Sequence, residues 1–138
     1  MQTVTVTRTV PAPPDAVREA MADHGAFMRA GGFDDVSVSG NVIRLTNRVG
    51  ILTIELDLEV VEDEAAFVYE QRDGMFETMR TEFALEVVDG GTKVTASTDF
   101  ALDVSVVGDF LDGTVIKRQR RKELEGQLDY LEAVQSTT

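Results

Sequence analysis

Apolar and polar residues alternate along much of the chain with a period of two, which is typical of β-strands that bury one face. The clearest case is 51–61, where Leu, Ile and Val at the even positions alternate with Thr, Glu and Asp. Residues 3–10 repeat the pattern with Val against Thr. The alternation predicts an antiparallel sheet with one face on the core and one face in water.

Turn residues separate further segments of this kind. Gly40-Asn41, Asp73-Gly74 and Asp89-Gly90-Gly91 each stand between two apolar runs, and Asp-Gly is a strong hairpin signal. The turns predict additional strands at 36–38, 42–49, 66–72, 75–88 and 92–104. The sheet should therefore have about six to seven strands.

Two stretches change to a helical pattern. Pro13 and Pro14 end the first strand and open a helix that runs to Ala22, and a short helical piece follows at 26–30. After Gly108-Asp109 the helical pattern continues to about Val134. This last helix is long enough to cover the apolar face of the sheet, so we expect a single α+β domain over residues 1–138.

The order of elements and two local motifs resemble the START-like polyketide cyclase/dehydrase and lipid-transport superfamily, whose fold is called the helix-grip fold. Residues 9–17, TVPAPPDAV, are similar to the family's strand-to-helix opening. Residues 100–104, FALDV, are similar to its last strand before the gripping helix. The tail with Leu124, Leu128 and Leu131 resembles a subgroup likened to coenzyme Q-binding proteins.

This resemblance implies a curved antiparallel sheet wrapped around the C-terminal helix. It also implies a deep cavity between the two for a hydrophobic or amphipathic small molecule, such as a lipid, a quinone or a polyketide-like compound. Members include carriers, receptors, cyclases and chaperone partners, so the fold leaves the chemistry open.

Composition narrows the classes of function. The 138 residues contain 25 Asp and Glu against 13 Lys and Arg, for a net charge of −12, which opposes nucleic-acid binding. No apolar run is long enough to insert stably in a membrane, and no signal peptide is visible, so we expect a cytoplasmic protein. Many acids with only three Lys favour a halophile-like surface over an acidic surface that binds a partner.

Catalytic and metal-binding residue types are scarce. The chain has no Cys and one His, His24, which excludes cysteine chemistry, a thiolate metal site and a polyhistidine metal site. His24 follows the first helix in a loop, where a lone His is more often a surface or capping residue than a base. The acids at 34–35 and 62–64 are contiguous and lack the spacing of cation ligands. We therefore expect no catalytic residue, no metal and no cofactor.

Several polar residues fall in phase with apolar neighbours on the strands. They either form structural pairs, such as Arg8 with Glu77, or line a cavity and orient the polar end of a ligand. For the set as a whole, a lined cavity is the better account. The predicted lining comprises Leu56, Tyr69, Met75, Glu77, Met79, Phe83, Thr98 and Phe100.

Basic residues concentrate on the C-terminal helix, where five of the 13 fall within 117–122. At about 100° per residue from Leu124, the side chains of Lys117, Arg120 and Arg121 project from the core-facing stripe. Long basic side chains here either lie along the sheet edge and pair with acids, or form a cationic cavity mouth. We expect Lys117 and Arg121 to hold an anionic or carbonyl group at that mouth.

These observations favour a protein that binds an amphipathic small molecule without catalysis. One alternative is a cyclase or dehydratase acting on a polyketide-like substrate, with Glu77, Tyr69 or an Arg as acid or base. The other is a module that docks on a protein partner, whose identity the sequence leaves unknown.

Overall fold

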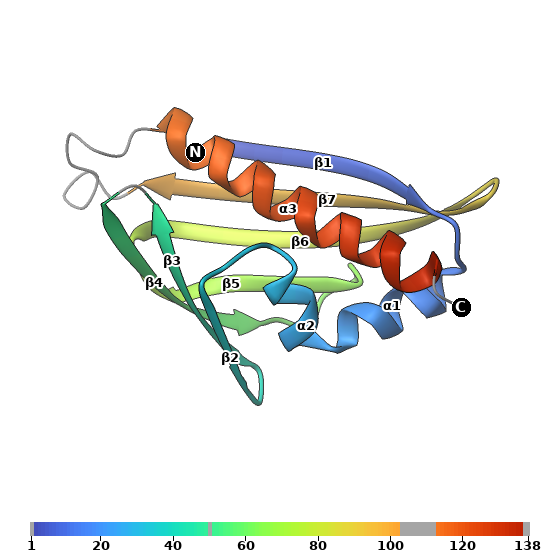
Figure 1. Cartoon of the computed structure of the whole chain (residues 1–138), viewed down its shortest axis with the longest axis horizontal. Coiled ribbons are helices and arrows are strands. Elements are labelled where there is room, and N and C mark those ends of the chain that lie inside the picture. The colour runs from blue at the N-terminus through green and yellow to red at the C-terminus, as the bar shows by residue number, and fades with distance from the viewer. Residues whose placement is uncertain (1, 50, 103–112, 137–138) are drawn as a thin grey trace.

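In the computed structural model, the described residues are 2–49, 51–102 and 113–136. Seven strands and three helices lie in these ranges (Figure 1). In chain order they are β1 (Gln2–Val10), α1 (Pro14–Ala22), α2 (His24–Arg29), β2 (Asp35–Ser39), β3 (Val42–Val49), β4 (Leu52–Val60), β5 (Phe67–Asp73), β6 (Phe76–Val88), β7 (Gly91–Leu102) and α3 (Gly113–Ser136).

The described strands form one antiparallel sheet in the order β1-β7-β6-β5-β4-β3-β2. From β2 to β7 the chain is a meander, in which each strand pairs with the next. The exception is β1, which pairs with β7, so that Gln2 lies opposite Phe100 and Val10 opposite Thr92. The predicted antiparallel sheet and helix-grip α+β fold are confirmed.

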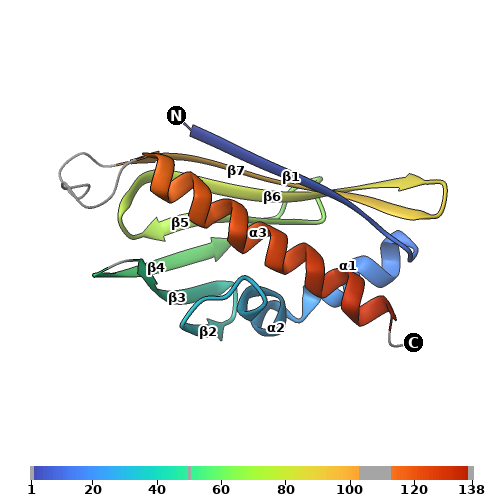
Figure 2. The ribbon, with the colours of Figure 1, turned by 45° about the horizontal axis from the view of Figure 1, so that its top comes forward.

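The helices cover one face of this sheet. Figures 1 and 2 show α3 running obliquely across the strands, with α1 and α2 beside its C-terminal half. Leu124, Leu128 and Leu131 of α3 are fully buried, as the sequence predicts for its core-facing stripe. Burial of each such side chain contributes about 1.5–3 kcal/mol, which makes this face the main seat of the core.

An aromatic cluster fills the space under α2. Phe27 of α2 meets Phe83 of β6 edge-on with ring centroids 5.0 Å apart, and Phe67 of β5 lies 5.9 Å from Phe83. His24 stacks on Phe67 at 4.8 Å. These contacts fix α2 against the centre of the sheet and explain why a short helix persists there.

Arg8 links the first strand to the last helix. Its guanidinium forms ion pairs with Asp129 and Glu132 of α3, and the hydrogen bond to Asp129 raises the pKa of Arg8. The suggested Arg8–Glu77 pair is therefore wrong. It assumed a partner on the sheet, whereas the half-buried Arg8 lies where α3 crosses β1.

A β-bulge changes the phase of β6. Phe76 pairs with Leu102 and Thr78 with Ala101, so Glu77 is the extra residue between them. Phe76 and Met79 are buried, whereas Glu77 is exposed. An uninterrupted period of two from Met75 would have turned Glu77 inward, and the bulge is the reason that it does not.

Two boundaries predicted from the sequence fall on 103–112, outside the described residues. These are the end of the last strand at Val104 and the start of the long helix at Gly108-Asp109. The described part of that strand ends at Leu102, and the described helix begins at Gly113.

Candidate functional site

A cavity lies between the N-terminal half of α3 and the β3–β4 side of the sheet. Its volume, taken as the space open to the centre of a water molecule, is about 30 Å³. Strands β3 and β4, the turn that leads into β6, α3 and the segment after α2 all contribute to its wall. The lining residues are Phe33, Leu45, Asn47, Ile54, Leu56, Met75, Phe76, Ile116, Gln119, Arg120 and Glu123.

The lining is apolar apart from four side chains. Asn47 comes from β3, and Gln119, Arg120 and Glu123 come from successive turns of α3. The cavity is thus an apolar space with one polar wall, an arrangement that orients amphipathic ligands. At its described size it holds one or two water molecules.

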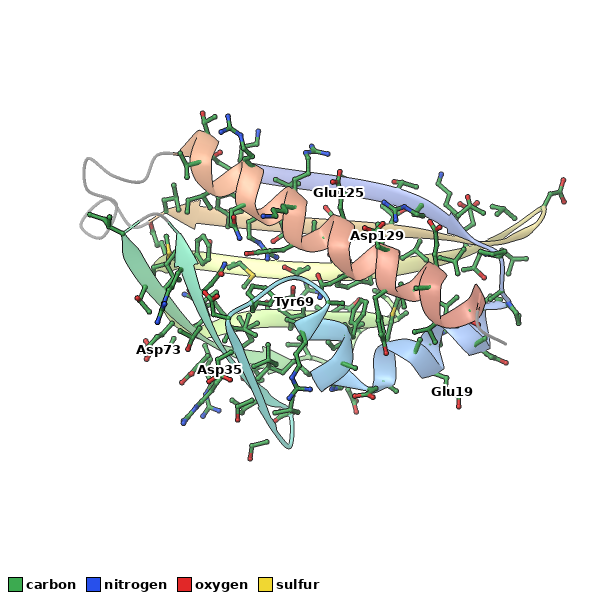
Figure 3. All side chains as sticks on the ribbon, in the orientation of Figure 1. Glu19, Asp35, Tyr69, Asp73, Glu125 and Asp129 are labelled. Carbon is green, nitrogen blue, oxygen red and sulfur yellow. The ribbon has the colours of Figure 1, made fainter. Side chains whose placement is uncertain are left out.

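Arg120 is the centre of the polar wall. It is only 5% exposed, and its Nη2 donates to Thr81 Oγ1 at 3.0 Å and to Thr98 Oγ1 at 3.2 Å. The hydroxyl of Tyr69 lies 3.5 Å from the same nitrogen. Strands β5, β6 and β7 therefore each supply one oxygen to the guanidinium, and Figure 3 shows Tyr69 in the interior between sheet and helices.

Glu123 balances the charge of Arg120 one turn further along α3. One carboxylate oxygen pairs with Nη1 of Arg120, and the other accepts hydrogen bonds from Asn47 at 3.0 Å and Gln119 at 3.1 Å. Both charged side chains are buried. A buried ion pair is tolerated when such additional hydrogen bonds satisfy it, and here they do so for the carboxylate.

The guanidinium remains charged in this setting. Burial by itself opposes the charge, but Tyr69 and Glu123 outweigh it and raise the pKa of Arg120. A permanent cation thus borders an apolar cavity, where a hydrogen bond to a ligand is stronger than in water.

One donor of Arg120 has no partner. Its Nε is buried and makes no hydrogen bond within the described part of the chain. An unsatisfied buried donor costs about 1–3 kcal/mol, which a hydrogen bond to an added acceptor would recover. The Nε–H group is therefore the donor of Arg120 that still lacks a partner among the described residues.

The structure brings some of the predicted lining residues together. Leu56 and Met75 line the cavity, while Tyr69 and Thr98 lie beside Arg120 behind its polar wall. Met79, Phe83 and Phe100 are buried, yet they do not line this cavity. Phe83 belongs to the aromatic cluster, and Phe100 packs on Phe76 with centroids 5.4 Å apart.

The three charged residues of the prediction lie elsewhere. Glu77 is exposed because of the bulge, and Lys117 and Arg121 are exposed on α3. The leucines used to set the helical phase sample only the C-terminal half of α3. In the N-terminal half, Ile116 and Arg120 form the buried edge, so the stripe is displaced away from Lys117 and Arg121.

Sequence reasoning missed most of the polar wall. The helical phase did place Arg120 inward. A further signal was available in the spacing, because Arg120 is three residues before Glu123 and seven before Gln127, which puts these three polar residues on one face of the helix. Asn47 continues the alternation of Ile43 and Leu45 in β3. On both β3 and α3, polar residues thus recur at the spacing of their buried apolar neighbours, and this pattern could have indicated a buried polar wall.

The described residues offer little for other chemistry. No group of three or more His, Cys, Asp or Glu side chains within them could hold a metal ion. His24 is stacked on Phe67, away from the cavity lining. None of the described helices is both long and apolar enough to cross a membrane.

Residues 1–135 match the family described as polyketide cyclase / dehydrase and lipid transport. Among curated proteins, none has a sequence that matches this chain. The match covers nearly the whole length, including every described strand and almost all of α3.

Several solved structures share the fold. A START superfamily protein from Mycobacterium smegmatis has a TM-score of 0.75 and 15% identity, over 99% of both chains. The protein TTHA0849 from Thermus thermophilus has a TM-score of 0.73 and 17% identity, over 96% of this chain and 99% of that one. The Zhui aromatase/cyclase from Streptomyces sp. R1128 has a TM-score of 0.71 and 22% identity, over 95% and 93%.

Proposed function

Because this chain belongs to the polyketide cyclase / dehydrase and lipid transport family, we propose that it binds an amphipathic small molecule under α3, with an oxygen atom of the ligand on Arg120. The observation that carries the proposal is that Arg120, which lines an apolar cavity, has a buried Nε–H group without a partner in the described residues. The ligand class is a molecule with an apolar body and one carboxylate, carbonyl or similar acceptor, as in a fatty acid, a quinone or a polyketide-like compound.

The polar wall supports this orientation of the ligand. Asn47 and Gln119 donate to Glu123 and hold its carboxylate in place, and that carboxylate pairs with Arg120. Arg120 therefore cannot turn away from the cavity without leaving a buried carboxylate without its cation. Phe33, Ile54 and Leu56 provide the apolar surface opposite. A charge-assisted hydrogen bond in such surroundings favours a carboxylate over an alcohol.

A lipid-sized ligand has to enlarge the described cavity. Met75 and Phe33 stand in its wall, and an unbranched Met side chain adapts its shape at low cost. We therefore expect the ligand to enter by displacing these side chains. Ligand binding should then reduce the motion of the wall and raise thermal stability as ligand concentration increases.

A cyclase-type enzyme is the second candidate, and the phenol of Tyr69 beside Arg120 favours it. A phenol next to a cation could donate a proton to a developing enolate. However, Glu77 lies on the exposed face, and the cavity carboxylate, Glu123, is already paired. The described lining therefore lacks an available base, and non-catalytic binding is the better account.

The test uses dodecanoate as probe, with dodecan-1-ol as its uncharged analogue. We expect Arg120→Lys to weaken dodecanoate binding by about tenfold or more, since Lys keeps the charge for Glu123 but lacks Nε. Arg48→Lys is the matched control, because Arg48 is exposed on the opposite face of β3, next to Asn47. The Arg48→Lys variant should bind dodecanoate with the same affinity as the unaltered protein.

Two results would overturn the proposal. One is that the unaltered protein binds neither probe by calorimetry. The other is that Arg120→Lys, folded by circular dichroism, binds dodecanoate as tightly as Arg48→Lys does. Conversion of a polyketide-like substrate by the purified protein, lost in Tyr69→Phe, would instead support the enzyme.

A further inference from the structure

Four basic side chains lie together on the solvent side of α3. Lys117, Arg118, Arg121 and Lys122, here called the α3 basic patch, are all exposed. Within the residues that the structure describes, none of the four forms an ion pair. By contrast, Arg8, Arg44 and Arg80 each have an acidic partner.

This arrangement disfavours the helix that carries it. Lys117 and Arg121, like Arg118 and Lys122, are like charges four residues apart, a spacing at which they repel each other. The patch also occupies the N-terminal half of α3, whereas the acids Glu125, Asp129 and Glu132 follow in the C-terminal half. The helix dipole favours the opposite order, so helix stability does not account for the patch.

The patch lies over the candidate site. Ile116, Gln119 and Arg120 line the cavity, and the patch residues occupy the outer side of the same helical turns. The C-terminal end of β3 and the N-terminal end of β4 lie at the same end of the molecule as the start of α3 in both views (Figures 1 and 2). Ile51, which directly precedes β4, is 79% exposed, more than the exposed Val38 or Val87.

We propose that the α3 basic patch docks this end of the protein on an anionic phospholipid surface, with Ile51 in contact with the bilayer. This inference rests on the proposed function, because a ligand of the cavity would then move between the bilayer and the site. A planar bilayer can meet four cations and a separate apolar side chain at once. Basic clusters on a helix are attracted to anionic lipids in this way.

The acidic remainder of the protein orients this contact. The net charge of −12 repels an anionic surface at a distance. At physiological ionic strength, however, charges more than about 8 Å from the bilayer are largely screened. Acids on the far faces then contribute little, while the patch touches the lipid headgroups. Only one end of the molecule can therefore approach the bilayer.

The experiment is co-sedimentation with vesicles of phosphatidylcholine alone or of phosphatidylcholine with phosphatidylserine. The test variant replaces the patch with Gln at Lys117, Arg118, Arg121 and Lys122. The control variant replaces four exposed bases elsewhere with Gln, at Arg18, Arg48, Arg72 and Lys93. Both variants lose four exposed positive charges from different parts of the surface, and of the described control residues only Arg18 forms an ion pair, with Asp15.

We expect the unaltered protein and the control variant to bind the phosphatidylserine vesicles, less tightly as salt is raised, and not the neutral vesicles. The patch variant should bind at least tenfold more weakly, on the order expected for the loss of four basic contacts. Ile51→Ser should also reduce binding, but without changing its salt dependence. Equal loss in both quadruple variants, no vesicle binding, or preference for polyglutamate or a single-stranded oligonucleotide over vesicles would each overturn the inference.

The proposed function is tested separately by dodecanoate binding to the unaltered protein in the absence of vesicles. Dodecanoate binding without vesicle binding would remove the docking inference and leave the site intact. Vesicle binding without dodecanoate binding would remove the proposed function, and with it the role assigned here to docking.

Discussion

Arg120 and Glu123 form an ion pair in the interior of the protein, one turn apart on the same helix. The pair connects sheet and helix, because Arg120 also donates to Thr81 and Thr98 while Glu123 accepts from Asn47. Both side chains are almost fully shielded from bulk water. The two residues therefore depend on each other for stability far more than a surface pair would.

We expect each single replacement in this pair to be strongly destabilising. Arg120→Met or Glu123→Gln should lower the free energy of unfolding by about 3–5 kcal/mol, because the remaining charge is buried without its partner. The double variant should lose less than the sum of the two. Urea denaturation of the four proteins gives the coupling free energy. The exposed variants Arg121→Met and Glu125→Gln serve as controls, and we expect changes within about 0.5 kcal/mol. Additive losses would contradict the mutual dependence.

Gln127 should be replaceable with a gain in stability. Its Oε1 is buried without a hydrogen-bond partner in the described ranges, and its Nε2 reaches only the sulfur of Met28, at 3.4 Å. Gln127→Leu keeps most of the volume and removes the unsatisfied group. We expect the free energy of unfolding to rise by about 1–2 kcal/mol. Gln119→Leu, which removes a hydrogen bond to Glu123, should lower it by a similar amount. A loss of stability in Gln127→Leu would show that the amide has a partner.

Gly126 should not tolerate a methyl group, although it lies inside a helix. A Cβ atom there would overlap the carbonyl oxygen of Ala30 and lie 3.6 Å from the Cα of Gly31. Gly→Ala inside an exposed helix gains about 1 kcal/mol, but here we expect a loss of about 1–3 kcal/mol from the forced separation of α3 and the segment after α2. Thermal denaturation measures the change. Ala133→Gly, at an exposed position of the same helix, isolates the propensity effect. A more stable Gly126→Ala protein would refute the close contact.

His24 should make stability depend on pH. Burial lowers the pKa of His24 below 6.5, against an opposing effect of Asp23. The unfolded chain therefore binds a proton more readily than the folded protein. As the pH falls through about 6.5, the free energy of unfolding should decrease, and it should level off below the folded-state pKa.

This pH effect can be isolated with His24→Gln. The variant loses the stacking on Phe67 at every pH, so its stability is lower throughout. Only the difference between the two proteins as a function of pH reports the titration. We expect that difference to shrink as the pH falls through about 6.5 towards the folded-state pKa, because only the unaltered protein contains this titrating group. A constant difference would mean that His24 has the same pKa in both states.

Much of the fold was predictable because one physical rule applied along whole segments. In β1 and β4 apolar side chains recur at every second position, and burial of one face of a sheet requires that pattern. The Asp73-Gly74 turn and the prolines at 13 and 14 marked the boundaries between elements. These signals are local, so they can be interpreted without knowledge of the tertiary structure.

The site was less predictable because it depends on small displacements between elements. Glu77 lies on the outer face because of the β-bulge in β6, and the alternation of apolar and polar residues does not show where a bulge occurs. Lys117 and Arg121 became exposed through a displacement of the buried stripe in the first turns of α3. Arg120, rather than Lys117 or Arg121, is the buried base because Thr81, Thr98 and Tyr69 surround its guanidinium. These three residues come from three different strands, so no local pattern brings them together.

The pairing of β1 with β7 sets an order of events during synthesis. Gln2 of β1 can pair only after Phe100 of β7 has been synthesised, so β1 is made about a hundred residues before its partner strand. Until then its Val and Thr residues expose an unpaired edge, the kind of edge that invites aggregation. The meander from β2 to β7 can form meanwhile through local hairpins. The sheet therefore gains β1 only after β7 has been synthesised, and the ion pairs of Arg8 with Asp129 and Glu132 can form only after α3 has been synthesised.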